Sequence, residues 1–311
     1  MLVPTALTGL KSMVRGQVRF GEPMSLHTSF GVGGPADALV IPEDFDDVIS
    51  VLRYANKMHV PLIVMGGGTN LLIGDLGIRG IVLKINGGLD DIHWDGYRVQ
   101  AAGGAKLGDV VKMSVDKNMS GIERCFGIPG TIGGAVTMNA GTSAIYISRS
   151  VEKVGYVTLT GDRVILDHNQ MQFDYRTSLV QRSGGVIEWV QLKLKEADKD
   201  WLDKIMKQMI DYRREKQPKN TLNAGCIFRN PPASYAGLLI EQAGLKGVSE
   251  GGIVISDVHA NFLVNTGKGT SKDVLRLMTR ISNEIYRLNN VRLRPEVKIL
   301  GEWSGKFPDW F

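Results

Sequence analysis

Apolar residues recur at helical spacing in several stretches of the chain. The clearest predicted helix spans 270–289, where Thr270 and Asp273 match the capping box that opens a helix. Its predicted apolar stripe consists of Val274, Leu277, Met278, Ile281, Ile285 and Leu288. A second amphipathic helix is predicted over 200–217, with Trp201, Leu202, Ile205, Met209 and Ile210 on one face. Shorter helices are predicted after Pro42, over 107–117, and before Gly244.

Between these helices, short apolar runs and alternating runs predict strands. The predicted strands are 38–41, 62–65, 71–73, 81–85, 97–104, 151–160 and 184–198, followed by strands within 251–265 and 294–301. Only the first part of the chain has a β-α-β order. The sequence therefore predicts an α+β protein in three blocks, 1–90, 91–198 and 199–311.

Composition excludes several classes of protein. The 311 residues are 43% hydrophobic and 22% charged, which is typical of a globular chain and not of a disordered one. No apolar run approaches the roughly 18 residues of a membrane span, and the first residues lack a basic leader, so an intracellular, cytoplasmic protein is expected. Two cysteines and five histidines without ligand spacing argue against a metal site.

The net charge of +5 has two interpretations. It is either an ordinary solvated surface or an attraction for the phosphates of a small ligand. Nucleic acid is not an expected partner, because the lysines and arginines are scattered rather than gathered in a stripe.

The usual nucleotide motifs are absent or out of context. The chain has no G-x-x-x-x-G-K-[ST] loop and no G-x-S-x-G elbow. Gly31 to Ala36 fits G-x-G-x-x-A, but no apolar strand precedes it, so it is not the dinucleotide loop of a Rossmann unit.

Two glycine-rich loops are stronger evidence for a bound phosphate ligand. Gly66, Gly67 and Gly68 follow a buried strand and precede Thr69 and Asn70. Three consecutive glycines can expose main-chain N–H groups as an anion nest suited to a pyrophosphate, whereas a plain tight turn needs only one or two.

The second loop, 127–134, alternates apolar residues with glycine and includes Gly130, Thr131, Gly133 and Gly134. Such a run suits backbone pressed against a flat, partly apolar ligand. Together the two loops predict one long ligand with a diphosphate in its middle.

The ordered motifs GGGTNLLI, GIPGTIGGAVTMNAG, YRTS, NAGCIFRNP, GLLIEQAGLKG, HANFLVN and RPEVKILG closely resemble those of the UDP-N-acetylenolpyruvoylglucosamine reductases. The resemblance covers residues 20–303. It implies a non-Rossmann FAD-binding fold of the vanillyl-alcohol-oxidase type, with two FAD subdomains, 1–90 and 91–198. It also implies an α+β substrate-binding domain, 199–311, whose last strand returns toward the FAD site.

The resemblance also implies FAD as cofactor, NADPH as co-substrate and a UDP-sugar enolpyruvyl ether as substrate, in a flavin oxidoreductase of peptidoglycan synthesis. The chain resembles the compact second type of the family, which lacks a mobile tyrosine loop. Thr69-Asn70 stands where some related oxidases attach FAD through histidine, so non-covalent FAD is expected. A monomer or weak homo-oligomer without membrane partners is expected.

The family's catalytic residues map onto three positions. Arg176 in YRTS would bind the substrate carboxylate and stabilise developing charge. Glu296 in RPE would orient that region or assist proton delivery. Cys226 stands where many members have serine, and a thiol with a pKa of about 8.5 is still protonated at pH 7 and can donate. The alternative interpretation of Cys226 is a buried small apolar residue, which is our interpretation of Cys125.

Substrate contacts are expected from Tyr175, Asn230 and Arg213, the last with Arg214 and Lys216 near a diphosphate or simply on the polar face of a helix. His259 is expected only to brace its strand. Two other functions stay open at this level: another FAD-linked oxidase or dehydrogenase of the same superfamily, and a non-catalytic nucleotide-sugar-binding protein.

Overall fold

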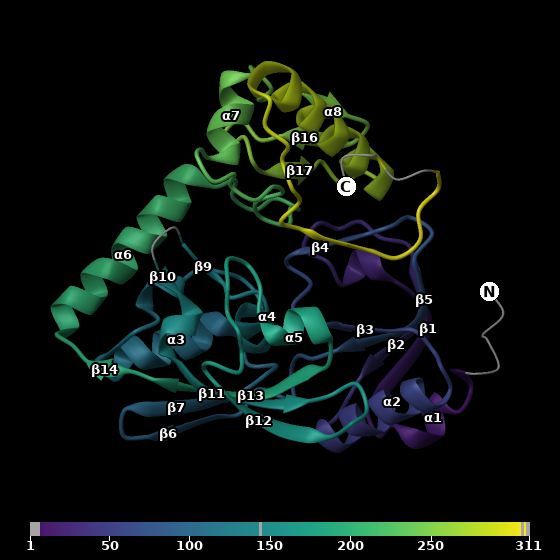
Figure 1. The fold of residues 1–311 in the computed structure, drawn as a ribbon, viewed down its shortest axis with the longest axis vertical. Coiled ribbons are helices and arrows are strands. Elements are labelled where there is room, and N and C mark those ends of the chain that lie inside the picture. Colours follow the sequence, from purple (N-terminus) through teal and green to yellow (C-terminus); the bar gives the residue numbers. More distant parts are fainter. Residues whose placement is uncertain (1–6, 143–144, 306–307, 309–311) are drawn as a thin grey trace. The chain divides into compact units, whose positions relative to one another are not determined.

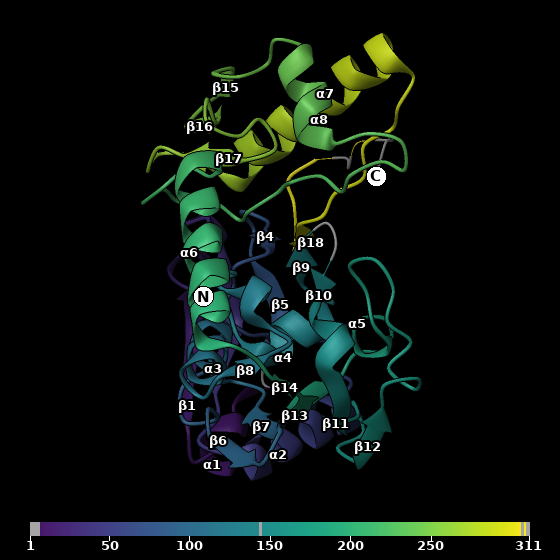
Figure 2. The ribbon, with the colours of Figure 1, turned by 90° about the vertical axis from the view of Figure 1, so that its left-hand side faces the viewer.

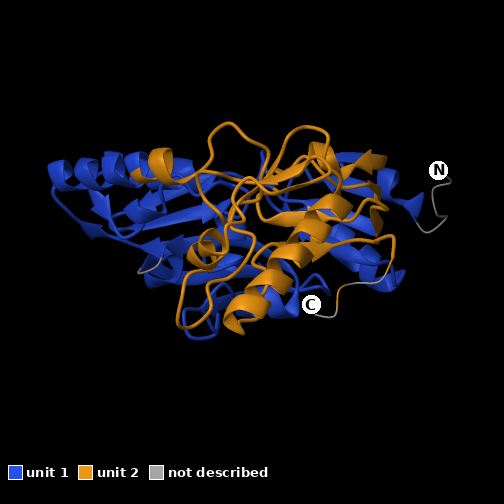
Figure 3. Ribbon diagram, turned by 90° about the horizontal axis from the view of Figure 1, so that it is seen from above, with its two compact units in different colours: residues 1–20, 38–67, 80–211 blue, residues 21–37, 68–79, 212–311 orange. Residues whose placement is uncertain are grey.

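The structure, a computed structural model, describes residues 7–142, 145–305 and 308. The chain divides into two compact units (Figure 3). Unit 1 comprises residues 1–20, 38–67 and 80–211, and unit 2 comprises residues 21–37, 68–79 and 212–311. In the described residues no helix is long and apolar enough to cross a membrane.

A four-stranded sheet contributes to unit 1, in the order β1-β2-β5-β3 (Figure 1). Its elements are β1 (Gln17–Pro23), β2 (Pro35–Ile41), β3 (Leu62–Met65) and β5 (Ile78–Lys84), with β3 and β5 parallel. The predicted helix after Pro42 is α2 (Phe45–Lys57), which begins where Asp44 accepts hydrogen bonds from the N–H groups of Asp46 and Asp47. Its apolar side packs with the short α1 (Leu10–Met13) against strand residues such as Ile81.

A five-stranded antiparallel sheet forms the rest of unit 1, in the order β12-β11-β13-β7-β6. Three helices line one side of this sheet in Figure 1: α3 (Leu107–Asp116), α4 (Ile132–Thr137) and α5 (Leu179–Ser183). The strands are β6 (Ile92–Asp95), β7 (Arg98–Ala102), β11 (Val151–Val157), β12 (Arg163–Asp167) and β13 (Val186–Lys193). Two small pairs accompany them: β8 (Met119–Ser120) with β14 (Lys195–Glu196), and β9 (Gly141–Thr142) with β10 (Ile145–Tyr146). Short 3-10 turns are η3 (Glu123–Cys125) and η4 (Ile147–Ser150).

Unit 2 is built on a small antiparallel sheet of β15 (Ser249–Glu250), β16 (Ile253–Ile255) and β17 (Leu263–Asn265). The helices α7 (Ala236–Gln242) and α8 (Ser271–Asn289) lie beside this sheet (Figure 2). The predicted capping box of α8 is confirmed, and the 3-10 turn η2 (Met24–Leu26) also belongs to this unit. The last strand, β18 (Lys298–Leu300), pairs in parallel with β4 (Leu71–Ile73), the strand that follows the glycine loop.

The predicted helix at 200–217 forms as α6 (Lys199–Lys216), but its apolar stripe is only partly buried. Leu202 and Ile205 are buried, whereas Trp201 is 41% and Ile210 is 47% exposed. The stripe of α8 is likewise buried except at Leu288, near the end of the helix, which is 48% exposed. The predicted apolar stripes therefore remain exposed at these three positions.

Candidate functional site

The first glycine loop begins at Gly66, directly after Met65, the buried last residue of β3. Gly68 has a φ of +67°, a left-handed conformation that glycine adopts without strain. A Cβ on Gly66 would lie 2.5 Å from Oγ1 of Thr131, so the loop backbone lies against the second glycine loop. Gly66, at the start of the first loop, and Thr131 of the second loop are therefore neighbours within unit 1.

Thr131 begins the short helix α4. Its Oγ1 accepts a hydrogen bond from the N–H of Gly134 at 3.2 Å. Gly133 packs directly on Gly103, whose oxygen accepts from the Gly133 N–H at 2.9 Å and would lie 2.7 Å from a Cβ there. The second loop therefore differs from the expected continuous ligand-facing backbone: residues 132–137 are helical, and Gly133 serves helix packing.

The first loop can accept the phosphates of FAD. Among the described residues, no hydrogen bond uses the main-chain N–H of Gly67 or Gly68, although Gly68 is buried. A buried N–H without an acceptor is rare in folded proteins and is satisfied by an anion placed at the loop. Thr69 and Asn70 place a hydroxyl and an amide directly after these groups.

Tyr175 and Arg176 occupy the tip of a two-residue turn in unit 1. Asp174 and Thr177 exchange two main-chain hydrogen bonds across it, at 3.1 and 3.2 Å. The side chain of Asn139 donates to the oxygen of Asp174 at 3.0 Å and ties the turn to the end of α4. Arg176 is half-buried with a φ of +57°, a conformation that costs a non-glycine residue about 1 kcal/mol. The turn thus fixes the main chain that carries this guanidinium, whose Cζ lies 5.6 Å from the ring centre of Tyr175.

Cys226 lies in unit 2 at the end of a tightly bonded turn. The side chain of Asn223 accepts from the N–H of Gly225 at 2.9 Å, and Gly225 has a φ of +77°. Ser29 anchors the turn: its Oγ donates to the oxygen of Asn223 at 2.7 Å, and its oxygen accepts from the N–H of Asn223 at 3.1 Å. The N–H of Ser29 also donates to the oxygen of Gly68 at 3.1 Å. Ser29 therefore connects the cofactor loop to the turn that carries the thiol.

His259 and Asn261 hold the other side of this turn. The main chain of Cys226 bridges that of Phe262, and Asn261 accepts from and donates to the main chain of Phe228. The N–H of Asn261 donates to Nδ1 of His259 at 3.1 Å, which makes the imidazole neutral at that nitrogen. Burial lowers the pKa of His259, which keeps the ring neutral. The hydrogen bond to Asn261 supports the bracing role expected of His259.

Glu296 lies two residues before β18, beside the Cys226 turn, also in unit 2. Its N–H donates to the oxygen of Ile227, the residue after Cys226, at 2.7 Å. Its own oxygen accepts from Nδ2 of Asn70 at 3.3 Å. Within unit 2 the side chain of Asn70 therefore bonds the main chain of Glu296, and the main chain of Glu296 bonds the residue after Cys226.

The predicted substrate residues of unit 2 occupy helix ends. Oδ1 of Asn230 accepts from the N–H of Ala236, the first residue of α7, at 3.0 Å. Arg213, half-buried in the last turn of α6, donates from Nη1 to Gln217 at 3.2 Å. The positions of Ser29, Asn139 and Asn223 were not predicted as part of the site; only Asn223, two residues before a glycine, had a local signal for a turn.

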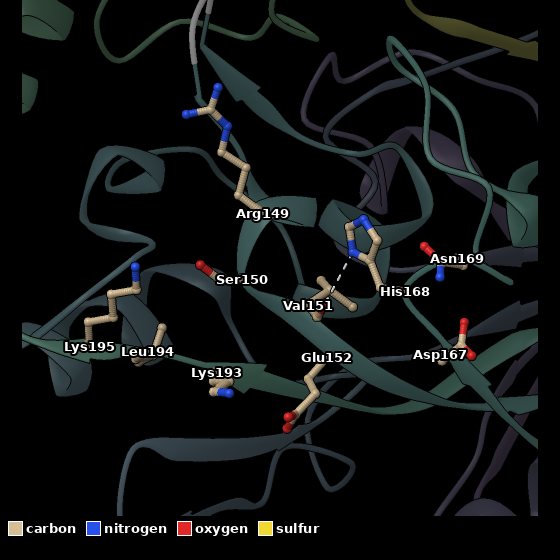
Figure 4. Close-up of a pocket in the computed structure, with 10 residues that line it drawn as sticks. All are labelled: Arg149, Ser150, Val151, Glu152, Asp167, His168, Asn169, Lys193, Leu194 and Lys195. Atoms are coloured by element: carbon tan, nitrogen blue, oxygen red, sulfur yellow. Dashed lines mark hydrogen bonds between the residues drawn. The ribbon is translucent and has the colours of Figure 1, made fainter.

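A groove of about 630 Å³ in unit 1 contains none of the predicted site residues. Figure 4 shows Arg149 and Glu152 extending in opposite directions from it. The carboxylate of Glu152 is bonded by Arg98 and Gln191, and His168 contacts the oxygen of Val151 at 3.2 Å. Its charged groups do not converge on a common point, so the groove is not the candidate site.

Comparisons with known proteins agree with this arrangement. The family model described as "UDP-N-acetylenolpyruvoylglucosamine reductase, C-terminal domain" matches residues 217–300, and the model described as "FAD binding domain" matches residues 36–167. A UDP-N-acetylenolpyruvoylglucosamine reductase of Bacillus pumilus is 44% identical over 289 residues, 92% of this chain and 95% of its own. One of Caldanaerobacter subterraneus is 38% identical over 94% and 97% of the two chains. The crystal structure of the Thermus caldophilus reductase is similar with a TM-score of 0.79 at 33% identity, over 92% of this chain and 98% of that one.

Proposed function

The chain belongs to the UDP-N-acetylenolpyruvoylglucosamine reductase family, and we propose that Arg176, Cys226 and Glu296 perform its substrate chemistry. The reaction is the FAD-dependent, NADPH-driven reduction of the enolpyruvyl ether of UDP-N-acetylglucosamine to the lactyl ether. The product, UDP-N-acetylmuramate, is used in peptidoglycan synthesis. We propose that the FAD-binding fold is of the vanillyl-alcohol-oxidase type, which the match to an FAD binding domain supports.

FAD, when bound, supplies the redox chemistry, taking hydride from NADPH and passing hydride to the substrate. The first loop would hold it through the N–H groups of Gly67 and Gly68, beside Gly66, Thr69 and Asn70. The second loop would contribute Gly130, Thr131 and Gly134, while Gly133 packs α4 on Gly103. We propose non-covalent binding, because Thr69-Asn70 offers no histidine for attachment.

Arg176 binds the substrate carboxylate. Hydride addition to the terminal carbon of the enolpyruvyl group builds negative charge next to that carboxylate, and a fixed cation lowers the energy of this state. A guanidinium stays charged at all relevant pH values and can grip a carboxylate through two hydrogen bonds. The rigid turn around Arg176 supports this role.

Cys226 donates the proton that completes the reduction at the adjacent carbon. The observation that carries this assignment is the hydrogen bond from the Glu296 N–H to the oxygen of Ile227, which sets the thiol and the carboxylate on adjoining segments. Glu296 would orient the substrate carboxylate region or assist proton delivery. Tyr175, Asn230 and Arg213 would contact the rest of the substrate, with Asn230 and Arg213 suited to a diphosphate.

Separating the two half-reactions tests the assignment. In Cys226→Ala, NADPH should still bleach the flavin under anaerobic conditions, while reoxidation by the enolpyruvyl substrate should slow at least about 100-fold. Cys226→Ser should stay within about tenfold of the wild type, because a hydroxyl can also donate. Normal turnover by Cys226→Ala would remove Cys226 from the mechanism.

We further propose that residues 1–90 and 91–198 form FAD-binding subdomains and residues 199–311 the substrate-binding domain. The FAD-binding match at 36–167 and the reductase match at 217–300 support this division. We propose cytoplasmic localisation, where UDP-sugars and NADPH are found, and a monomer or weak homo-oligomer that sedimentation across a concentration series would distinguish.

A further inference from the structure

Two cationic side chains of unit 2, Arg229 and Lys298, lie close together on paired segments. The main chain of Phe228 bridges that of Pro295, and the N–H of Arg229 donates to the oxygen of Arg294 at 2.8 Å. This pairing runs residues 226–230 antiparallel to residues 294–298, and the two cations are near enough for the charge of Arg229 to act on Lys298.

Neither cation has a carboxylate partner in the part of the chain that the structure describes. Among the described residues, no salt bridge involves Arg229 or Lys298. Burial lowers the pKa of Lys298, and the positive charge of Arg229 lowers it further. Two like charges in a half-buried setting repel each other, so this arrangement costs free energy in the protein without a ligand.

The guanidinium of Arg229 also has an unused donor. Its Nε is buried and makes no hydrogen bond among the described residues, although the residue as a whole is half-exposed. An N–H donor removed from water and left without an acceptor costs free energy, so native structures nearly always provide one. Here the acceptor and the missing negative charge would both be supplied by a single oxyanion.

Both residues adjoin predicted site residues. Arg229 precedes Asn230, and Lys298 lies two residues after Glu296. The N–H of Lys298 donates to the oxygen of Asn70 at 3.0 Å, which attaches this cation to the end of the first glycine loop. The pair therefore belongs to the two paired segments that also carry Cys226 and Glu296.

We propose that Arg229 and Lys298 form a subsite for an oxyanion, a carboxylate or phosphate group of one of the ligands of the reductase reaction. This rests on the proposed function. The guanidinium offers paired donors to such a group, and the ammonium adds a point charge, so the bound oxyanion satisfies Nε and cancels the repulsion.

Removing one charge separates a binding role from a structural one. Arg229→Gln and Lys298→Met should melt at or above the temperature of the wild type without ligand, because the repulsion is relieved. The same variants should bind the oxyanion-bearing ligand at least about tenfold more weakly. Lys298→Arg should restore binding, and Lys272→Met, at an exposed position of α8, is the matched control that should change neither quantity.

Two sugar nucleotides identify the oxyanion. If it is the enolpyruvyl carboxylate, the variants lose affinity for the enolpyruvyl substrate but keep that for UDP-N-acetylglucosamine, which lacks this group. If it is the UDP diphosphate, both affinities fall alike. A phosphate of FAD would appear as loss of flavin on purification, and a phosphate of NADPH as slower flavin reduction.

The proposal is overturned if the variants retain flavin, wild-type reduction by NADPH and wild-type affinity for both sugar nucleotides. It is also overturned if they melt below the wild type with binding unchanged, since that result assigns the pair a structural role. Failure of the Cys226 assignment is seen separately, because it appears in the rate of flavin reoxidation and not in UDP-N-acetylglucosamine binding.

Discussion

The side chain of Asn70 is hydrogen-bonded to the main chain of Glu296, 226 residues later in the sequence. Nδ2 of Asn70 donates to the oxygen of Glu296 at 3.3 Å, and the oxygen of Asn70 accepts from the N–H of Lys298 at 3.0 Å. The parallel pairing of β4 with β18 continues this contact from Leu71 onward. The last residue of the cofactor loop thus helps to set the main-chain position of a proposed catalytic carboxylate.

Asn70→Ala should slow the substrate half-reaction because Glu296 loses this tether. One neutral hydrogen bond contributes about 1 kcal/mol, so the expected loss in the rate of flavin reoxidation is up to about tenfold. Stopped-flow reoxidation by the enolpyruvyl substrate measures it. Asn56→Ala, at an exposed position of α2, is the control and should leave the rate unchanged. Equal rates in both variants would show that the contact does not position Glu296.

Ser29→Ala should affect the same half-reaction through the Cys226 turn. The substitution removes the bond from Oγ to the oxygen of Asn223 but keeps the main-chain bonds of Ser29. We expect reoxidation to slow a few-fold, and Asn223→Ala to slow it more, because Asn223 also bonds the N–H of Gly225 and Thr221. Flavin reduction by NADPH should stay normal in Ser29→Ala. A parallel fall in both half-reactions would indicate general damage to the fold instead.

Elements whose stability is encoded locally could be predicted from the sequence. The ends and buried faces of α2 and α8 follow from Asp44, Thr270 and the spacing of their apolar residues, all within the helices or beside them. By contrast, α4 was not predicted, because Gly133 and Gly134 disfavour a helix in isolation. It forms against Gly103, some thirty residues earlier, and this packing leaves no trace in the local pattern.

The candidate site divides in the same way. The loop glycines and the residues Arg176, Cys226 and Glu296 could be predicted from the sequence, because each lies in a short motif of unusual composition. Ser29 and Asn223 are 194 positions apart, and their contact is decided by tertiary folding. Edge strands were missed for a related reason: β12 pairs only with β11 and leaves Val164 39% and Ile165 61% exposed, so it lacks a clear buried face.

Glu152 should make stability depend on pH in the acid range. Arg98 and then Gln191 bond its carboxylate and lower its pKa from 4.5 to about 2. A carboxyl group with a lowered folded-state pKa stabilises the fold above about pH 4.5, and this contribution disappears as the pH falls toward 2. Glu152→Gln should therefore melt below the wild type at pH 6, with the difference shrinking at pH 3. Asp200→Asn, at an exposed position of α6, should show no such trend. A difference that stays constant from pH 6 to pH 3 would contradict the assignment.

Replacing Arg176 should change the rate of the substrate half-reaction much more than the free energy of unfolding. Because its φ is +57°, Arg176→Gly relieves a strained conformation while adding freedom to the unfolded chain, and the free energy of unfolding should stay within about 1 kcal/mol of wild type. The rate of flavin reoxidation by the enolpyruvyl substrate should nevertheless fall at least about 100-fold, since the cation is gone.

Arg176→Lys separates charge from geometry at the same position. It keeps the charge and the backbone strain but loses the two-bond grip on a carboxylate, so its reoxidation rate should lie between those of the wild type and Arg176→Gly. Arg280→Lys, at an exposed position of α8, controls for the substitution itself. If Arg176→Gly were clearly less stable yet fully active, the turn would be a structural feature, and the carboxylate of the substrate would need another cation.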